Sequence, residues 1–423
     1  MPTSVSPSTT GTLSSYCLPL FIVIPKNVCK SQAPSTKFQI VGHCPTTPQA
    51  LKGLNLMLEI WDFSTSSIAI YCRNDYNIAC VYLKVSIPTR GEKLEGDGPV
   101  KVTMVIPSYW ARESGVGWKE GDAIYDHPTP LDSEGTLLRA IQSIKKLEDK
   151  DFQLVIIAVA TSEDIETQVE KTVANIIKSS NPGVDVLLFG HTHLKQIHEL
   201  ISKSKKEYND LLQLRGYSNI RNLCMFIPHV LGSEVAVLID DDEVFEDPEF
   251  MSKAKEFIGK NIGGRTVNAV AGYYLQPDGD YHVKKPFRPW MKYWDQYDRM
   301  NEAFDRIIGR EPRLKETHFV FGGNMVIHRN LFTLVPFDPG VRRGEDIDFL
   351  INARMFGFHF FLDNQLSIKH LPPPNTHPTW MQLREDIYRF IYERAKIEHQ
   401  KEIKGMTKVY PEDFDSYPEH PSK

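Results

Sequence analysis

The chain has 423 residues, enough for two or three average domains or for one large α/β domain with additions. Its composition is ordinary for a globular protein, and its net charge of −5 argues against a broad basic surface, so we expect no nucleic-acid partner. The longest early apolar run, residues 18–24, is too short to span a bilayer and has no basic stretch before it. We therefore expect a soluble, cytoplasmic protein.

Residues 1–99 differ in character from the rest of the chain. The first 15 residues are rich in Ser, Thr, Pro and Gly, a composition that predicts disorder. Five of the 6 cysteines fall within the first 80 residues without a C-x-x-C pair, so a zinc site is not indicated. Short apolar stretches separated by turn residues predict a small β-rich appendage of unknown function, with a domain boundary near residue 100.

From residue 100 onward, buried strands alternate with helical stretches. The first strand is predicted to end at Pro107 and Ser108, a polar loop covers 112–134, and Ser162 is a candidate N-cap for the second helix. This order predicts an α/β fold with a mostly parallel central sheet flanked by helices, in which ligands bind beyond the carboxyl ends of the strands. The predicted strands are 100–110, 152–161, 184–190 and 235–239, and the predicted helical stretches are 136–150, 162–180 and 193–231.

A run of four acids follows the strand at 235–239 directly. Asp240 and Asp242 form a D-x-D pattern, and their hard oxygen ligands suit Mg²⁺ or Mn²⁺. Like charges at this spacing repel, so they need either water or a cation among them. The pattern leaves a metal site and a solvated turn open.

Two further motifs lie downstream. Gly322-Gly323-Asn324 interrupts a strand-like stretch at 318–332, which indicates either a bulge or the close approach of another molecule to the backbone. Glu345 and Asp346 open a stretch that predicts an amphipathic helix, where carboxylates either cap the helix or include a general base.

A histidine ends the last strand-like stretch. Residues 358–374 run to His370 and then into three prolines. A histidine in this position is either an ordinary surface residue or, beside D-x-D and E-D motifs, a third metal ligand.

The order of these motifs resembles the GT-A fold glycosyltransferases, especially those of the family 2 type. The similarity covers about residues 100–375 and is closest over 216–243, where Arg221-Asn222 opens a helix that leads to the strand and the D-x-D. The resemblance implies a GT-A fold domain at 100–375, an N-terminal appendage at 1–99 and a C-terminal helical extension at 376–423. The longer 112–134 loop and ATSED at the second strand end depart from the family pattern.

The resemblance also implies roles for individual residues. Asp346 would be the general base of an inverting reaction, and Glu345 would orient the acceptor. Asp240, Asp242 and His370 would hold Mn²⁺ or Mg²⁺, and the acceptor would meet Gly322, Gly323 and Asn324. The donor nucleotide would contact Pro107, Ser108, Asp164, Arg221, Asn222, Asp240 and Asp241, and Arg221 or Arg343 would supplement the cation at the phosphates.

The implied activity is that of a hexosyltransferase. The sugar would pass from a UDP- or GDP-sugar to an acceptor hydroxyl on a saccharide, a small polyol or acid, or a lipid-linked molecule. A lipid acceptor would require peripheral docking to a membrane. The tail, helical from Trp380 to Lys404 by its pattern, could pack on the domain or form a homodimer.

An aromatic stretch at 287–299 lies between the D-x-D and the glycine motif. Trp290 and Trp294 fall at roughly helical spacing, which is typical of core packing, while the alternative is a platform on which an acceptor sugar stacks.

Three other functions are consistent with parts of the sequence. His191 and His193 in FGHTH suit a calcineurin-like metallophosphoesterase, but the other motifs of that family are missing, so we expect both histidines in a loop after the third strand. A retaining GT-A transferase of the mannosylglycerate or glucosyl-phosphoglycerate synthase kind would share the D-x-D and the late histidine, and Asp346 would then be structural. A non-catalytic binding module is the third.

Overall fold

The computed structural model describes two short strands of the N-terminal part and most of the chain from residue 100 to 414. The described residues are 68–74, 77–83 and 100–414, without 203–208, 210–211, 285, 288, 294 and 374–378. By their contacts the residues form two compact units, Met1–Asp97 and Gly98–Lys423. In the first unit, β1 (Ile68–Asn74) and β2 (Asn77–Leu83) pair as an antiparallel hairpin, and the predicted disorder of residues 1–15 lies outside the described residues.

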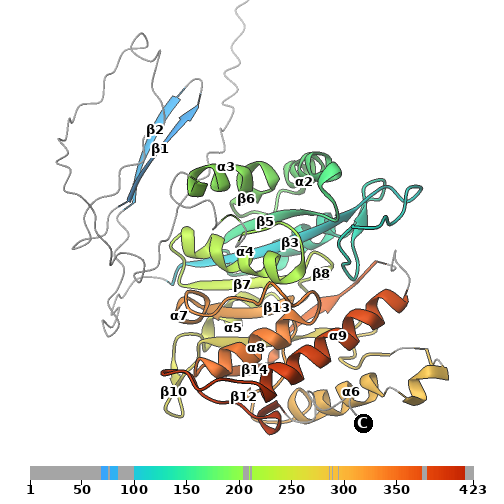
Figure 1. Cartoon of the computed structure of the whole chain (residues 1–423). Coiled ribbons are helices and arrows are strands. Elements are labelled where there is room, and N and C mark those ends of the chain that lie inside the picture. Colours follow the sequence, from blue (N-terminus) through green and yellow to red (C-terminus); the bar gives the residue numbers. More distant parts are fainter. Residues whose placement is uncertain are drawn as a thin grey trace, which may run out of the picture. The chain divides into compact units, whose positions relative to one another are not determined.

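The second unit is built on a ten-stranded mixed sheet with helices against it (Figure 1). The strand order is β12-β14-β11-β13-β7-β3-β5-β6, with β4 paired to β3 and β8 paired to β14. This confirms the predicted α/β class with a mostly parallel sheet. The strands are β3 (Val102–Ala111), β4 (Thr129–Pro130), β5 (Gln153–Ala160), β6 (Val186–Phe189), β7 (Val235–Ile239), β8 (Glu243–Val244), β11 (Ala269–Leu275), β12 (Leu314–Glu316), β13 (Asn324–His328) and β14 (Phe360–His370), and a separate hairpin joins β9 (Asn261–Ile262) to β10 (Arg265–Thr266).

One strand in the middle of the sheet runs against its neighbours. β7, β3, β5 and β6 are parallel, and β11 is parallel to β14, but β13 is antiparallel to both β7 and β11. The start of β13 therefore lies at the edge where β7 and β14 end, and Asn324 pairs with Ile239 there. This reversal brings the glycine motif, the acidic run and His370 to one edge of the sheet.

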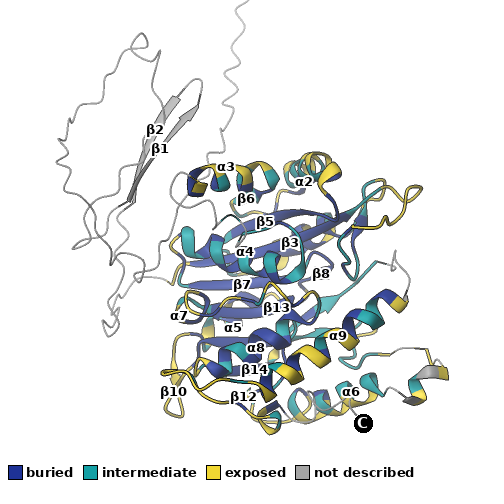
Figure 2. Cartoon of the chain, viewed as in Figure 1, coloured by how far each residue is buried: buried dark blue, intermediate teal, exposed yellow. Residues whose placement is uncertain are grey.

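The buried strands lie between helices whose outer sides are exposed (Figure 2). Val102, Met104 and Ile106 of β3, with Leu154 of β5 and Val237 of β7, belong to one continuous apolar core. Within the described ranges, none of the helices combines the length and the apolarity that crossing a bilayer needs. The helices are α1 (Leu137–Ser143), α2 (Glu166–Ser180), α3 (His191–Ser202), α4 (Tyr217–Val230), α5 (Phe250–Glu256), α6 (Gln296–Ile307), α7 (Arg329–Phe332), α8 (Glu345–Met355) and α9 (Thr379–Glu398).

Two predicted element ends are wrong. β3 does not end at Pro107 and Ser108 but continues to Ala111, because its pairing with β5 extends to Trp110 and its pairing with β4 extends to Ala111. Its pairing with β7 stops at Val105, so the missing N–H of the proline falls where the ladder is already incomplete on one side. Ser162 precedes a 3₁₀ turn instead of capping a helix, and its hydroxyl donates to the Asp164 carboxylate at 2.7 Å.

Two helices also differ from the prediction. α8 is buried around most of its circumference rather than amphipathic, since α9 covers the side that would otherwise face water. His191 and His193 lie in the first turn of α3 rather than in a loop. Glu170 of α2 accepts the backbone N–H of Thr192 at 3.0 Å and contacts His191 Nδ1 at 2.6 Å, so FGHTH serves as the start of a helix.

Candidate active site

The acidic run after β7 is mostly withdrawn from water. Only Asp240 is partly exposed, while Asp241, Asp242 and Glu243 have exposed fractions of 4%, 7% and 0%. The solvated turn that the pattern left open is therefore wrong. Burying several carboxylates together is costly unless each finds a partner, so their partners define what the site can do.

Arg221 of α4 connects the D-x-D to the E-D motif. Its Nη1 lies 2.8 Å from Asp240 Oδ1, its Nη2 donates to Asp240 Oδ2 at 3.0 Å, and its Nε donates to Glu345 Oε1 at 3.3 Å. The guanidinium is almost fully buried, so these contacts are shielded from solvent. One cation thus holds two predicted site carboxylates that are more than a hundred residues apart in sequence.

Asp241 points back into the sheet. Ser108 donates to Asp241 Oδ2 at 2.6 Å and itself accepts from Trp110 Nε1 at 2.8 Å. Ser108 is fully buried and so is Pro107, which leaves neither side chain on a surface that a nucleotide could contact. Burial raises the pKa of Asp241 well above its ordinary value. In this structure Ser108 anchors the acidic run.

Asp242 and His370 form a close pair. His370 Nε2 lies 3.2 Å from Asp242 Oδ2, and β8 pairs with the end of β14 so that Leu371 N–H donates to the Asp242 carbonyl at 2.9 Å. Burial alone would raise the pKa of Asp242, but the hydrogen bond and charge of His370, together with the charge of His127, bring it below its ordinary value. The imidazole ring also stacks on Tyr274 at 5.0 Å between centroids.

The sequence did not single out His127. Its ring lies 6.2 Å from that of His370, measured between centroids, and it comes from the 112–134 loop. The length of that loop was the only sequence signal, because the two histidines are 243 residues apart.

Glu243 supports the run from inside. Its Oε2 accepts the backbone N–H of Asp240 at 3.0 Å, while its Oε1 has no close hydrogen-bond partner among the described residues, although Tyr274 lies near enough to favour the charged form of the carboxylate. Burial, and then the charges of Asp240 and Asp242, raise the pKa of Glu243 well above its ordinary value. A fully buried carboxylate oxygen without a donor is the kind of group that a cation would stabilise.

The paired glycines lie against these charged groups. A Cβ atom at Gly323 would overlap the carboxylates of Asp240 and Glu243, and one at Gly322 would crowd Arg221 and approach Asp346. Only glycine leaves room for this contact between the backbone and the carboxylates. The groups close to this motif are therefore carboxylates of the chain itself, and the predicted approach of another molecule stays a prediction.

Glu345 and Asp346 begin α8 beside Arg221. Burial, followed by the neighbouring Asp346, raises the pKa of Glu345 to about 7. Burial also raises the pKa of Asp346, and the positive charge of Arg389 opposes that rise. A carboxylate with a raised pKa, partly accessible at the start of a helix, has the properties of a general base.

Two predicted ligand contacts are engaged with the protein backbone. Asn222 donates to the Phe337 carbonyl at 2.9 Å and accepts its N–H at 2.8 Å. Asn324 is fully buried and donates to the carbonyls of Tyr273 and Leu366 at 3.3 and 3.0 Å, joining β11 to β14. In this structure both side chains hold strands and loops together, a use that sequence spacing does not reveal.

Asp164 lies at the end of β5, apart from the acidic run. Its side chain is 60% exposed and pairs with Arg112, which also donates to Asp122 at 3.1 Å from both Nε and Nη2. The hydrogen bond from Arg112 holds the pKa of Asp164 well below its ordinary value. Arg112 and Asp122 were not predicted, since nothing in the loop sequence marks them as partners.

The side chains of the two tryptophans that could form an acceptor platform lie outside the described part of the structure. Trp294 lies outside the described residues, and only the backbone of Trp290 is described, in a 3₁₀ turn at Pro289–Tyr293.

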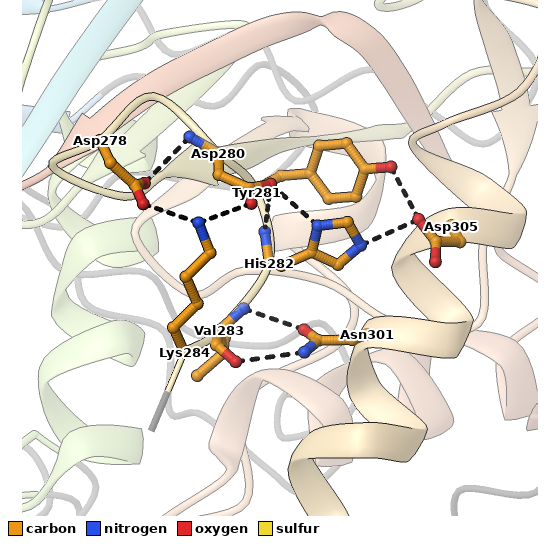
Figure 3. Close-up of polar contacts among 8 residues, drawn as sticks. All are labelled: Asp278, Asp280, Tyr281, His282, Val283, Lys284, Asn301 and Asp305. Carbon is orange, nitrogen blue, oxygen red and sulfur yellow. Dashed lines mark hydrogen bonds and ion pairs between the residues drawn. The ribbon is translucent and has the colours of Figure 1, made fainter. Parts of the chain in front are cut away.

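A second polar cluster lies further along the chain (Figure 3). His282 lies between two aspartates, with Nδ1 2.8 Å from Asp280 Oδ1 and Nε2 2.9 Å from Asp305 Oδ1 of α6. Lys284 Nζ lies 2.7 Å from Asp278 Oδ2 and 2.9 Å from Asp280 Oδ2. These contacts join the 278–284 segment to α6, and each of the three aspartates has a basic partner.

The predicted three-ligand metal site is not formed by the protein alone. Across the described part of the chain, no three His, Cys, Asp or Glu side chains are grouped so that they could hold a metal ion. The physical reason is that Asp240 turns to Arg221, which leaves Asp242 and His370 as a pair.

Comparisons with known proteins give structural similarity at low sequence identity. No family model and no curated protein matches the chain. The mannosyltransferase PcManGT from Pyrobaculum calidifontis, in complex with GDP-Man and Mn²⁺, matches 72% of this chain with a TM-score of 0.43 and 14% identity. TarS of S. aureus matches 72% with a TM-score of 0.38 and 11% identity, and GalNAc-T7 with UDP, GalNAc and Mn²⁺ matches 77% with 0.36 and 12%. The chain spans 66%, 41% and 55% of those three chains, respectively.

Proposed function

We propose that the chain is a metal-dependent glycosyltransferase that moves a hexose from a nucleotide-diphosphate donor to an acceptor hydroxyl. The observation that carries the proposal is the Arg221 bridge, because it joins the D-x-D carboxylate Asp240 to the E-D carboxylate Glu345. The Asp242–His370 pair lies at the same edge of the sheet. Groups suited to a diphosphate and groups suited to a nucleophile are thus brought together.

The residues present fit a divalent ion that a substrate helps to hold. Mg²⁺ and similar ions are commonly bound by one or two carboxylates together with substrate phosphates, rather than by a complete protein cage. Asp242 and His370 would supply the protein ligands, and the partnerless Oε1 of Glu243 marks a place where added positive charge would be favourable. When bound, Mn²⁺ or Mg²⁺ would neutralise negative charge on the leaving diphosphate.

The other residues would bind the donor and activate the acceptor. Arg221 would add fixed positive charge near the diphosphate while holding Asp240 in place. Asp346 would accept the proton of the acceptor hydroxyl, and Glu345 would orient that hydroxyl. Asp164, exposed and ionised beside Arg112, would meet the nucleoside.

A screen for donor binding tests this function. Thermal shifts are measured for a panel of nucleotide sugars led by GDP-mannose and UDP-GalNAc, each with and without Mn²⁺. We expect at least one donor to raise the melting temperature only when Mn²⁺ is present, and Asp242→Asn to abolish that rise. Asp278→Asn, in the exposed cluster of Figure 3, is the matched control and should respond like the wild type.

Turnover of the donor identified in this way separates the remaining possibilities. An inverted anomeric configuration in the product supports Asp346 as the base, whereas a retained configuration indicates the retaining mechanism. A panel without any stabilising donor, turnover or metal dependence would contradict the proposal and favour a non-catalytic binding module.

A further inference from the structure

The C-terminal helix α9 presents a charged face to the segment that begins α8. Asp386, Arg389, Glu393 and Lys396 recur every three or four residues, which places them on one side of the helix. α9 runs beside α8 in Figure 1. Several apolar side chains of α9, among them Tyr388 and Ile391, are instead exposed. The side of α9 turned toward the domain therefore carries these charged groups together with the buried apolar side chains of Met381, Phe390 and Ile397.

This face of α9 contacts residues 343–348, the segment that leads into α8 and contains Asp346, at three successive points. Asp386 Oδ1 lies 2.5 Å from Arg343 Nη1, just before the turn into α8. Lys396 Nζ lies 2.5 Å from Asp348 Oδ1, one turn further on. Between these two contacts, Arg389 lies against Gly344.

The contact with Gly344 is specific in shape. Gly344 has a φ of +75°, a left-handed backbone conformation that residues other than glycine rarely adopt. It is the N-cap residue of α8. A Cβ atom at this position would clash with the Arg389 guanidinium. The turn that aims Glu345 and Asp346 is thus shaped around an arginine of α9.

Charged groups surround Asp346 from three elements. Glu345 is on its own helix, Arg221 comes from α4, and both Arg389 and Glu393 come from α9. Arg221 is already bound to two other carboxylates. Of the charges near Asp346, that of Arg389 opposes the effect of burial most strongly, so it favours the ionised carboxylate.

Glu393 shows that this environment does not favour a second negative charge. Both of its carboxylate oxygens are buried and have no hydrogen-bond partner among the described residues. Burial raises its pKa to about 8, and the charges of Asp348 and Asp346 contribute to that rise. The charge of Arg389 is shared between Asp346 and Asp386, whose Oδ1 lies 3.2 Å from Arg389 Nε.

We propose that Arg389 of α9 is a positioning residue for the general base: it shapes the turn at Gly344 from which Asp346 follows, and it places a positive charge beside that turn. This proposal rests on the proposed function, in which Asp346 accepts the acceptor proton. It makes α9 part of the reaction machinery rather than a tail that merely packs on the domain or forms a dimer.

The test compares the full-length wild type with Arg389→Gln, Arg389→Lys and Arg394→Gln. Arg394 is the matched control, since it is an exposed arginine of α9 paired with Glu398 at 2.8 Å. The first readout is the pH dependence of kcat/KM with the donor that Mn²⁺-dependent thermal shift identifies. The second needs no substrate: the rate at which a carbodiimide modifies Asp346 is followed against pH by peptide mass spectrometry, because only the protonated carboxyl reacts.

The expected result is a shift in the titration of Asp346. In R389Q the acidic limb of the profile should move up by about 1 pH unit, so that kcat/KM below the limb falls about 10-fold. The modification midpoint should move by the same amount. R389K, which keeps the charge but displaces it, should shift both midpoints upward by a smaller amount than R389Q, and R394Q should match the wild type.

Other outcomes would overturn the inference. A uniform loss of turnover and stability in R389Q, with the limb and the modification midpoint unchanged, would show a purely structural arginine. If R389Q does not fold, R389K decides, since its displaced charge should shift both midpoints in the same direction by a smaller amount, and no shift would contradict the proposal. If the wild type turns over no donor, the proposed function fails, while the modification midpoint still decides the role of Arg389.

Discussion

Two clusters of neighbouring carboxylates in this chain, one exposed and one buried, contain groups whose pKa values are shifted in opposite directions. In the exposed cluster of Figure 3, hydrogen bonding to Lys284 lowers the pKa values of Asp278 and Asp280. In the run after β7, burial raises the pKa values of Asp241 and Glu243. Each aspartate of the first cluster has a solvent-accessible basic partner, whereas the second cluster has Arg221 and His370 for Asp240 and Asp242 but no basic partner for Glu243 among the described residues. This difference motivates the proposal that a cation from outside binds at the second site.

The largest expected effect comes from removing the base. Asp346→Asn keeps the shape of the side chain but cannot accept the proton, so kcat should fall by about 10²–10⁴-fold. Donor binding, measured by Mn²⁺-dependent thermal shift, should remain near the wild-type value. Normal turnover would show that Asp346 is structural.

Replacing the buried arginine, Arg221, should lower the free energy of unfolding more than any other substitution considered. Arg221→Met leaves Asp240 and Glu345 without their shared partner, and the free energy of unfolding should drop by about 3–5 kcal/mol. Arg299→Met is the matched control, because Arg299 also contacts two carboxylates but its side chain is 50% exposed rather than 3%. Its loss in urea unfolding should be much smaller, because solvent screens exposed ion pairs. Equal losses in the two variants would remove the distinction between buried and exposed charge networks.

The glycine contact gives a smaller effect that is specific to the buried site. Gly323→Ala forces a methyl group against Asp240 and Glu243 and should lower stability by about 1–3 kcal/mol while weakening the Mn²⁺-dependent shift. Gly115→Ala has open space around the added Cβ and serves as the control. A G323A variant with wild-type stability and metal response would argue against this close packing.

The exposed cluster should respond weakly and in a defined pH range. Burial would lower the pKa of His282, but hydrogen bonds to Asp280 and Asp305 raise it overall. Its stabilising contribution is therefore full below the unfolded pKa of about 6.5 and is lost as the pH rises through the higher folded value. His282→Gln should lose about 0.5 kcal/mol at pH 5.5 and less at pH 8.5, measured by urea unfolding. An equal loss at both pH values would mean that the charge of His282 does not matter.

The fold class could be predicted from the periodicity of apolar residues, but the antiparallel direction of β13 could not. The strand at 235–239 and the helix start at Glu345 agree with the structure because burial and turn signals are local. Periodicity carries no information on strand direction, so the reversal of β13 was not predicted. That reversal is what places the glycine motif beside the acids.

The site was predicted as a set of residue types, and their partners were not. Asp240, Asp242, His370, Glu345 and Asp346 do lie at one edge of the sheet. Their partners come from α4, from the 112–134 loop and from α9, and contacts over such sequence separations leave no pattern in a single sequence. For the same reason, the burial of Ser108 and the backbone contacts of the two asparagines could not be read from the motifs.

The central claim is that Asp242 and His370 bind a divalent cation together with the donor diphosphate, and measuring Mn²⁺ binding tests it most directly. Isothermal titration of the full-length chain with Mn²⁺, in the presence of a stabilising nucleotide sugar or of UDP or GDP, is compared among wild type, His370→Ala and Asp278→Asn. The account predicts one Mn²⁺ per chain in the wild type and D278N, and an affinity at least 10-fold lower in H370A. Equal affinities in all three proteins, or no Mn²⁺ binding in the wild type, would contradict it.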